Sequence, residues 1–228
     1  MGSTPDAAER GTARPLTKGE RTRERILDVA QGLFAQSGYR SVSLREIAAR
    51  AGVTHAGVLH HFDNRDAILL ALMARRDKTQ IVELAAGRAT DPGRMLRVSR
   101  VIVEQNTHDP LSVALYVKLS AEATDPEHPA HDYFQRRYRT AEATFTTAFS
   151  TWISAHRLTG DPGRLARLFI ALSDGLQLQW ALDDFSDQAG KAMVDGVASF
   201  LALIGFDPGP EELEREREEL RAQGYPFS

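Results

Sequence analysis

The sequence contains no cysteine, so disulfide bonds, thiolate zinc sites, iron–sulfur clusters and cysteine nucleophiles are all excluded. It also lacks a long hydrophobic run. The longest apolar stretch, around residues 196–206, is far shorter than the roughly 18–20 residues that a membrane span needs. The first 14 residues are polar and lack the apolar core of a signal peptide. These absences predict a cytoplasmic protein with no membrane partner.

The motifs of common catalytic sites are missing as well. There is no glycine-rich phosphate loop, no G-x-S-x-G and no H-E-x-x-H sequence. His128 and His131 have a spacing that could chelate zinc, but a solvated first turn of a helix explains them better. The sequence therefore predicts a chain that is not an enzyme and has no metal site and no cofactor.

Charge is distributed unevenly along the 228 residues, although the net charge is only −3. Residues 1–78 hold 13 Lys and Arg against 9 Asp and Glu, whereas residues 79–228 hold 15 against 22. The basic excess is greatest in residues 10–25, where six basic side chains accompany two acidic ones. A basic N-terminal unit on an acidic body predicts a polyanionic partner for that unit alone.

Apolar residues recur at helical spacing through most of the chain, and no alternating strand pattern is present, so we expect an all-α fold. Five Asp-Pro pairs are interpreted as helix starts, because Asp is a strong N-cap and Pro suits the first helical position. They begin at Asp91, Asp109, Asp125, Asp161 and Asp207. The predicted helices cover residues 18–37, 44–51, 55–61, 64–87, 92–108, 111–124, 127–157, 163–184, 188–204 and 210–221. The charged segment 211–221 is expected to be a solvated surface helix.

Residues 18–65 carry the clearest local signals. Gly38 is suited to end the first helix, and Ser43 with Glu46 forms the sequence pattern of a capping box at the start of the second. In the spacing Ala48–Gly52–Val58, the first residue allows two helices to touch, the second tolerates positive φ in a tight turn, and the third anchors the next helix. This pattern predicts a helix-turn-helix, with the corner of a plain three-helix bundle as the alternative. The outer face of the second helix is small and polar, and such a face can enter a DNA major groove.

One ordered set of residues within segment 19–78, which is about a quarter of the chain, carries a family resemblance. It consists of 22–27, Ala30, Leu33, Phe34, Gly38, Tyr39, 43–48, 51–54, 60–62 and Arg65. Through these residues, segment 19–78 closely resembles the N-terminal DNA-binding domain of TetR-family transcriptional regulators. Segment 173–180 is similar to the penultimate helix of the family.

The resemblance implies roles for individual residues. It places a DNA-binding surface at Ser43, Arg45, Thr54, His55, Ala56, Gly57, His60, His61 and Arg65. In one departure, Leu59 stands where most members carry a phosphate-binding tyrosine, and leucine cannot donate a hydrogen bond. We expect His60 to replace that contact.

The resemblance also implies an effector cavity in the helical body and a dimer interface built by its last two strong helices. The expected cavity residues are Ile102, Val103, Asn106, Leu119, Tyr138, Phe145 and Trp152. The two helices are apolar over a broad arc, which indicates either full burial or pairing with a second chain. The expected interface residues are Leu176, Trp180, Val197, Phe200, Leu201 and Ile204.

Together these features predict a DNA-binding domain and a helical-bundle domain for effector binding and dimerisation. The expected boundaries are 1–17 for a disordered basic arm, 18–63 for the helix-turn-helix, 64–206 for the body and 207–228 for a charged tail. The expected function is that of a repressor that binds a near-palindromic double-stranded DNA operator as a homodimer and is released by a small molecule. A helical protein–protein adaptor with a purely structural helix-turn-helix is the alternative.

Overall fold

The computed structural model describes residues 16–79, 91–223 and 225, with the side chains of 77–79 set aside. Nearly all of the predicted arm over residues 1–17, and residues 80–87 of the predicted helix 64–87, lie outside this part. Within it, the chain forms ten α-helices and no strand, which confirms the all-α prediction. None of these described helices combines the length and apolar composition that a membrane span requires.

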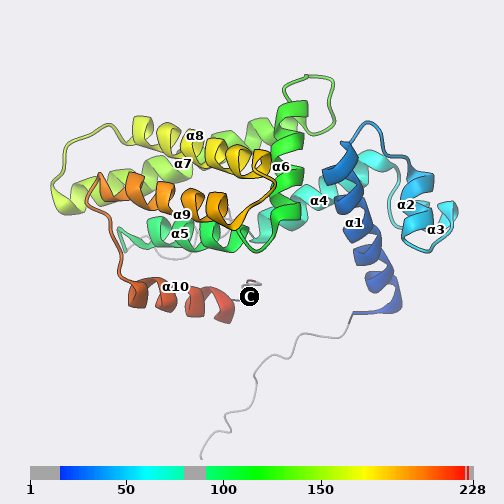
Figure 1. Cartoon of the computed structure of the whole chain (residues 1–228), viewed down its shortest axis with the longest axis horizontal. Helices are drawn as coiled ribbons and strands as arrows, with labels where there is room; N and C mark the ends of the chain where they lie inside the picture. Colours follow the sequence, from blue (N-terminus) through cyan, green and yellow to red (C-terminus); the bar gives the residue numbers. More distant parts are fainter. Residues whose placement is uncertain (1–15, 80–90, 224, 226–228) are drawn as a thin grey trace, which may run out of the picture.

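A small N-terminal unit lies at one end of an elongated helical body (Figure 1). The unit contains α1 (Lys18–Ser37), α2 (Leu44–Arg50) and α3 (His55–Leu59), and α4 (Arg65–Thr79) runs from it toward the body. The body contains α5 (Arg94–Asn106), α6 (Pro110–Glu122), α7 (His131–His156), α8 (Pro162–Leu182) and α9 (Asp187–Ala202). The last helix, α10 (Pro210–Ala222), lies along α5 on the outside of the body.

The core of the N-terminal unit continues into the body. Ile26, Phe34 and Ile47 are fully buried in one cluster, which extends through α4 to Leu119 of α6 and Phe134 of α7. A second cluster joins α5, α7, α8 and α9. The N-terminal unit is therefore packed against α6 rather than merely tethered by α4. The predicted domain boundaries after residues 63 and 206 stay predictions.

The Asp-Pro interpretation is correct at two of the five places. Asp109 and Asp161 accept N–H groups at the starts of α6 and α8, with Pro at the first helical position. After Asp91, the helix begins only at Arg94. After Asp207, the helix begins at Pro210, because a residue before proline is pushed toward extended backbone and Gly209 has ψ of 162°.

The segment after Asp125 is a turn instead of the predicted helix start at 127. The Asp125 carboxylate accepts the Glu127 N–H at 3.0 Å, and α7 begins only at His131. Pro129 explains the difference, because it disfavours helical backbone at the residue before it. That residue, His128, instead turns its ring into the protein and accepts the Ala130 N–H at Nδ1.

Helix α10 is not the solvated helix that its charge pattern predicted. Leu213, Glu216 and Leu220 share one face and are buried against α5. The Glu216 carboxylate lies 3.3 Å from Nε of Arg94 and 3.2 Å from Nε of Arg97. A narrow apolar stripe and one buried ion-pair network are enough to dock an otherwise charged helix.

Candidate functional site

The turn between α2 and α3 has the geometry that the spacing of Ala48, Gly52 and Val58 predicted. Gly52 has φ of +64°, and the following N–H of Val53 donates to the Ala48 carbonyl at 3.0 Å. Ala48 and Val58 are buried where the two helices meet. The two short helices are thereby fixed at one angle, as a helix-turn-helix requires.

Side-chain caps start both helices of the motif. Ser43 Oγ accepts the Glu46 N–H at 3.2 Å, and Thr54 Oγ1 accepts the Gly57 N–H at 3.0 Å. The predicted N-cap at Ser43 is thus confirmed. The full reciprocal capping box, however, belongs to Thr17 and Glu20 at the start of α1.

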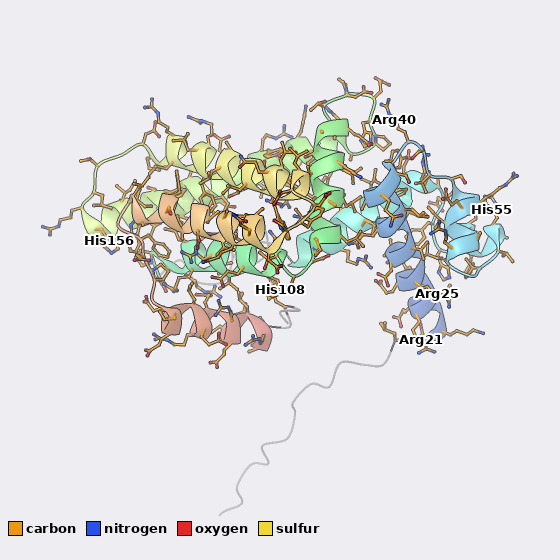
Figure 2. All side chains as sticks on the ribbon, viewed as in Figure 1. Arg21, Arg25, Arg40, His55, His108 and His156 are labelled. Atoms are coloured by element: carbon orange, nitrogen blue, oxygen red, sulfur yellow. The ribbon has the colours of Figure 1, made fainter. Side chains whose placement is uncertain are left out.

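The outer face of the motif is exposed and basic. Figure 2 shows His55 pointing away from the molecule at the start of α3. The predicted DNA-contacting residues that are exposed are Ser43, Arg45, Thr54, His55, Ala56 and His60. Arg25, Arg45 and Arg50 are exposed on the same unit, and within the described residues no carboxylate pairs with any of them. The surface therefore offers small polar groups for a groove and positive charge for phosphates.

Gly57 is half-buried against the cap of its own helix. A Cβ added there would lie 3.3 Å from Thr54 Oγ1 and 3.5 Å from Val53 Cβ. A side chain at this position would crowd the cap of the helix.

Leu59, at the position where the phosphate-binding tyrosine was expected, is 40% exposed.

His61 and Arg65 are less exposed than the other predicted contacts. Burial, together with the charges of His60 and Arg23, lowers the pKa of His61, so its ring is neutral at pH 7. Arg65 donates to the carbonyls of Val42 at 2.9 Å and Arg40 at 3.2 Å. Its guanidinium also covers the Tyr39 ring, 4.2 Å from the centroid. Arg65 therefore fixes the loop before α2, and its phosphate contact stays a prediction.

Helix α6 and the loop after it hold the N-terminal unit to the body. Lys118 Nζ donates to the carbonyls of Ala35 and Gln36, which end α1. In the loop, Asp125 pairs with Arg40. A cation at a helix C-terminus is favourable because the free carbonyls carry partial negative charge. These contacts tie the end of α1 and the loop after it to α6.

His128 belongs to the same junction. Its buried ring meets the edge of Tyr39 at 5.2 Å between centroids, and its Nε2 lies 3.4 Å from a Glu122 oxygen. Burial lowers the pKa of His128, which keeps the ring neutral. His131 instead places Nδ1 2.8 Å from the Ala123 carbonyl. Over the described residues, no group of three or more His, Cys, Asp or Glu could hold a metal ion.

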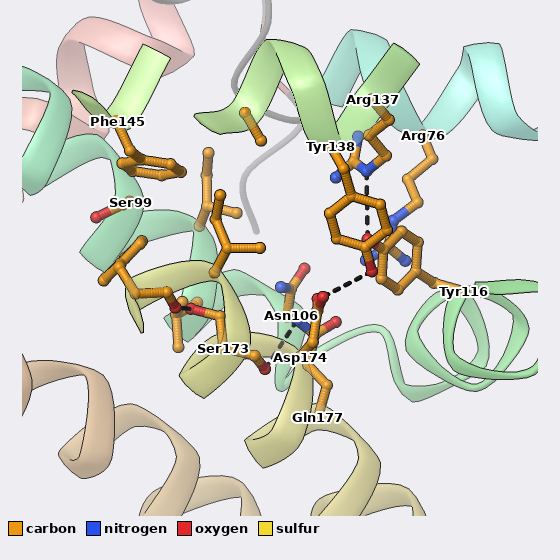
Figure 3. Close-up of a pocket in the computed structure, with 15 residues that line it drawn as sticks. Arg76, Ser99, Asn106, Tyr116, Arg137, Tyr138, Phe145, Ser173, Asp174 and Gln177 are labelled. Atoms are coloured by element: carbon orange, nitrogen blue, oxygen red, sulfur yellow. Dashed lines mark hydrogen bonds between the residues drawn. The ribbon is translucent and has the colours of Figure 1, made fainter. Parts of the chain in front are cut away.

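A part-open pocket lies between α4, α5, α6, α7 and α8 (Figure 3). Its empty volume is about 590 Å³, which includes space continuous with the solvent. Five of the seven predicted cavity residues line it: Ile102, Val103, Asn106, Tyr138 and Phe145.

The other two predicted cavity residues, Leu119 and Trp152, do not line this pocket. Leu119 is fully buried in the core shared by α1 and α6. The Trp152 indole N–H donates to the Ile204 carbonyl at 3.0 Å, and the ring packs on Phe206. Trp152 therefore fastens the far end of α7 to the end of α9.

Sequence reasoning missed most of the polar end of the pocket. The additional lining residues include Arg76, Tyr116, Phe169, Ile170, Asp174 and Gln177. Ser173, Asp174 and Gln177 interrupt the apolar residues of α8, and these polar positions were the available signal. Arg76 gave no such signal, because only the fold brings it to α6, where it donates to the Ser112 carbonyl.

A chain of polar contacts crosses this end of the pocket. Arg137 Nε donates to the Tyr116 hydroxyl at 3.4 Å, and the Tyr138 hydroxyl donates to Asp174 at 2.7 Å (Figure 3). Burial raises the pKa of Asp174 above the ordinary Asp value, against the lowering effect of Tyr138 and the two arginines. Burial likewise raises the pKa of Tyr138, so its hydroxyl keeps the proton it donates.

The predicted dimer residues on α8 and α9 divide into two groups. Trp180, Val197 and Leu201 are at most 3% exposed within a single chain, and their assignment to a partner contact stays a prediction. They form the core beneath α8 and α9, and the Trp180 N–H donates to the Ser186 carbonyl. The second group, Leu176, Phe200 and Ile204, is half-buried and remains partly accessible.

The outer face of α8 exposes leucines that the sequence analysis did not select. Leu168, Leu178 and Leu182 are 51%, 46% and 76% exposed. A Cβ added to Gly175, which lies between them along the helix, would meet no atom within 4 Å. The helix pair α8 and α9 lies on the face of the body toward the viewer in Figure 1.

Comparisons with known proteins agree with this arrangement. The sequence model of the family described as "Bacterial regulatory proteins, tetR family" matches residues 26–72, which run from α1 into α4. The HTH-type transcriptional repressor AcnR of Corynebacterium efficiens is 25% identical over 80% of this chain and 90% of its own length. The HTH-type transcriptional regulator AcrR of Shigella flexneri is 38% identical, over 38% of this chain and 40% of its own.

Solved structures share most of the fold. A SmeT–triclosan complex superposes with a TM-score of 0.64 at 22% identity, covering 83% of this chain and 98% of that one. SCO4454, a TetR-family transcriptional regulator from Streptomyces coelicolor, superposes with a TM-score of 0.63 at 22% identity, covering 81% of this chain and 90% of that one. With the helix-turn-helix in place and the family match over it, the N-terminal unit is a TetR-family DNA-binding domain, and the comparisons together support a TetR-family transcriptional regulator.

Proposed function

We propose that the chain is a repressor that binds a near-palindromic DNA operator as a homodimer in the cytoplasm and releases it when a small molecule occupies the pocket. The observation that supports DNA reading is the exposed outer face of α3 on a fixed helix-turn-helix. Thr54, His55 and Ala56 stand at its start, where a recognition helix contacts base edges. The surrounding arginines supply phosphate contacts, which position the protein without reading sequence.

The dimer proposal is supported by the apolar outer face of α8. Three large leucines are exposed there, and Gly175 allows another backbone to approach closely. An isologous pair of α8–α9 faces would bury these leucines in a four-helix contact. Such a dimer must hold its two α3 helices about 34–36 Å apart, one turn of DNA, to read successive major grooves.

The release proposal is supported by two connections between the pocket and the DNA-binding unit. Arg76 of α4 lines the pocket, and α4 begins directly after the helix-turn-helix. Tyr116 of α6 also lines it, and Lys118 of α6 holds the end of α1. A ligand that moves α4 or α6 therefore changes the spacing of the two reading helices, to the extent that its affinity differs between the two arrangements.

Selection of genomic fragments by the purified protein tests the proposal, with footprinting of the enriched fragments. We expect enriched sites with two related half-sites, and affinity for them that falls steeply as salt is raised. The His55→Ala variant should lose enrichment of these sites. The matched control is His156→Ala, because His156 is exposed at the opposite end of the molecule (Figure 2). No enrichment by the wild type would overturn the proposal and favour a protein–protein adaptor.

A further inference from the structure

The arginines of the pocket lining are engaged within the chain. Arg76 Nη1 donates to the Ser112 carbonyl at 2.7 Å, and Arg137 Nε donates to the Tyr116 hydroxyl at 3.4 Å. Both arginines also make further interactions, so their charges belong to the wall of the pocket. The uncharged polar groups of the lining therefore become the candidates for recognising a ligand.

The hydroxyl groups of the lining already direct their protons to other groups. Ser99 and Ser173 each donate to a carbonyl of their own helix at 2.8 Å. The Tyr138 hydroxyl donates to Asp174 at 2.7 Å, and the Tyr116 hydroxyl faces the Tyr138 oxygen at 3.5 Å. A hydroxyl whose proton is used can still accept a hydrogen bond, so these groups favour a ligand that donates.

Gln177 of α8 adds a buried acceptor that has no partner. The residue lines the pocket and is only 7% exposed. Its Oε1 is buried and accepts no hydrogen bond in the structure. Buried amide oxygens are normally satisfied, so the pocket should supply a donor to this atom.

The orientation of the Gln177 amide is fixed by its own helix. Nε2 donates to the Ser173 carbonyl at 3.2 Å. A carbonyl oxygen only accepts, so the amide nitrogen has to face Ser173 and the amide oxygen has to face away from it. The unpartnered atom is therefore an acceptor and not a donor.

The rest of the lining is largely apolar. In Figure 3, Gln177 and Asp174 lie at one end of the pocket and Phe145 at the other. The Phe145 ring lies 4.6 Å from that of Phe169 between centroids, and Ile170 lines the same pocket. Aromatic side chains bury large apolar groups and pack well on a flat ring.

We propose that the pocket takes an apolar molecule that carries one hydroxyl group, and that this hydroxyl donates to Gln177 Oε1. The apolar body lies against Phe145, Phe169 and Ile170. A phenol combines the two parts, because its hydroxyl donates and its ring packs on aromatic side chains. The inference rests on the proposed function in that occupation of this same pocket is what releases DNA.

The test is calorimetric titration of the full chain with matched pairs of probes. Each pair consists of a para-alkylphenol and its methyl ether, which keeps the ring and the oxygen but has no proton to donate. We expect the best-bound phenol to bind about tenfold more tightly than its ether, because the ether leaves a buried acceptor without a partner. An ether that binds as tightly as its phenol, or absence of phenol binding at every alkyl length, would overturn the proposal.

Variants identify the acceptor. Gln177→Met keeps the length of the side chain and removes the oxygen, so the phenol and its ether should bind about equally. Gln179→Met is the matched control, because Gln179 is exposed on the same helix and does not line the pocket. It should keep the wild-type preference for the phenol. A preference that survives in Gln177→Met would contradict the assignment.

Folding of the variants is measured separately, by circular dichroism and by binding to the selected operator without ligand. The preference of the wild type for the phenol is measured without any variant. A Gln177→Met protein that misfolds therefore leaves the test of the ligand class intact.

The outcome is separable from that of the proposed function. Operator binding without ligand is measured independently, by selection of DNA fragments. A protein that binds operator but does not distinguish phenols from their ethers refutes only the ligand class. A protein that binds phenols in a Gln177-dependent way without releasing DNA supports the ligand class and refutes effector release.

Discussion

The double substitution of Leu178 and Leu182 by Glu is expected to convert a dimer into monomers. Fully burying a leucine side chain is worth about 1.5–3 kcal/mol. Scaled by the 46% and 76% that remain exposed in one chain, the two leucines contribute about 2–4 kcal/mol per chain, and each counts twice in an isologous dimer. The total of about 4–7 kcal/mol corresponds to three to five orders of magnitude in the dimer dissociation constant.

Sedimentation equilibrium over a range of protein concentrations measures this change directly. The control is Leu70→Glu on α4, because Leu70 is similarly exposed, at 42%, and lies outside the α8–α9 face. Circular dichroism should show unchanged helicity in both variants, since none of the three leucines is buried in the core. A wild type that sediments as a monomer, or a double variant that retains the wild-type dissociation constant, would refute the assignment of this face.

Three further predictions follow from individual contacts. His55→Ala should cost about 1–3 kcal/mol of binding to the selected operator and much less with unrelated DNA, measured by fluorescence anisotropy; an equal loss on both would show that His55 reads no bases. Lys118→Met should lower the free energy of unfolding by about 1 kcal/mol in urea, because the carbonyls of Ala35 and Gln36 lose a charged donor; an unchanged value would contradict the role of this junction. Burial raises the pKa of the Asp174 carboxyl in the folded protein. Between the unfolded and the folded pKa, the native state keeps a carboxyl proton that the unfolded chain has lost. The stability that Asp174 contributes is therefore lost as the pH rises through the folded pKa. The free energy of unfolding of Asp174→Asn should therefore rise relative to that of the wild type as the pH increases above 3.8. Unfolding free energies of the two proteins that change in parallel with pH would contradict this.

Local geometry could be predicted because it depends on residues that are neighbours in the sequence. The positive φ at Gly52 and Gly38 and the cap at Ser43 each depend on a few consecutive positions. The same reasoning failed at Asp125, where Pro129 further along the chain changes the start of the helix. A helix-start signal therefore has to be interpreted together with the turn that follows it.

Long-range features were predictable only in part. A broad apolar arc on α8 and α9 shows that both helices are covered, but it does not say which side faces the same chain. Trp180 and Leu201 were assigned to a partner for that reason, and they lie in the chain's own core. Arg76 entered the pocket through the packing of α4 against the body, which no periodicity in α4 reveals.

The docking of α10 has a similar origin. Its composition is dominated by Glu and Arg, which predicted a solvated helix. Its three buried residues, however, face the Arg94 and Arg97 side of α5, and only the fold brings those partners together. Charge composition alone could not distinguish a solvated helix from one held by buried ion pairs.

In the proposed function, the pocket and the DNA-binding surface are coupled through α4 and α6. One thermodynamic cycle tests this coupling most directly. A small molecule that a screen shows to release the selected operator is titrated calorimetrically into the protein alone and into the protein saturated with that operator. Coupling between sites is reciprocal and typically about 1–3 kcal/mol, so operator should weaken ligand binding by the same factor by which ligand weakens operator binding. Equal ligand affinities with and without operator would contradict the account.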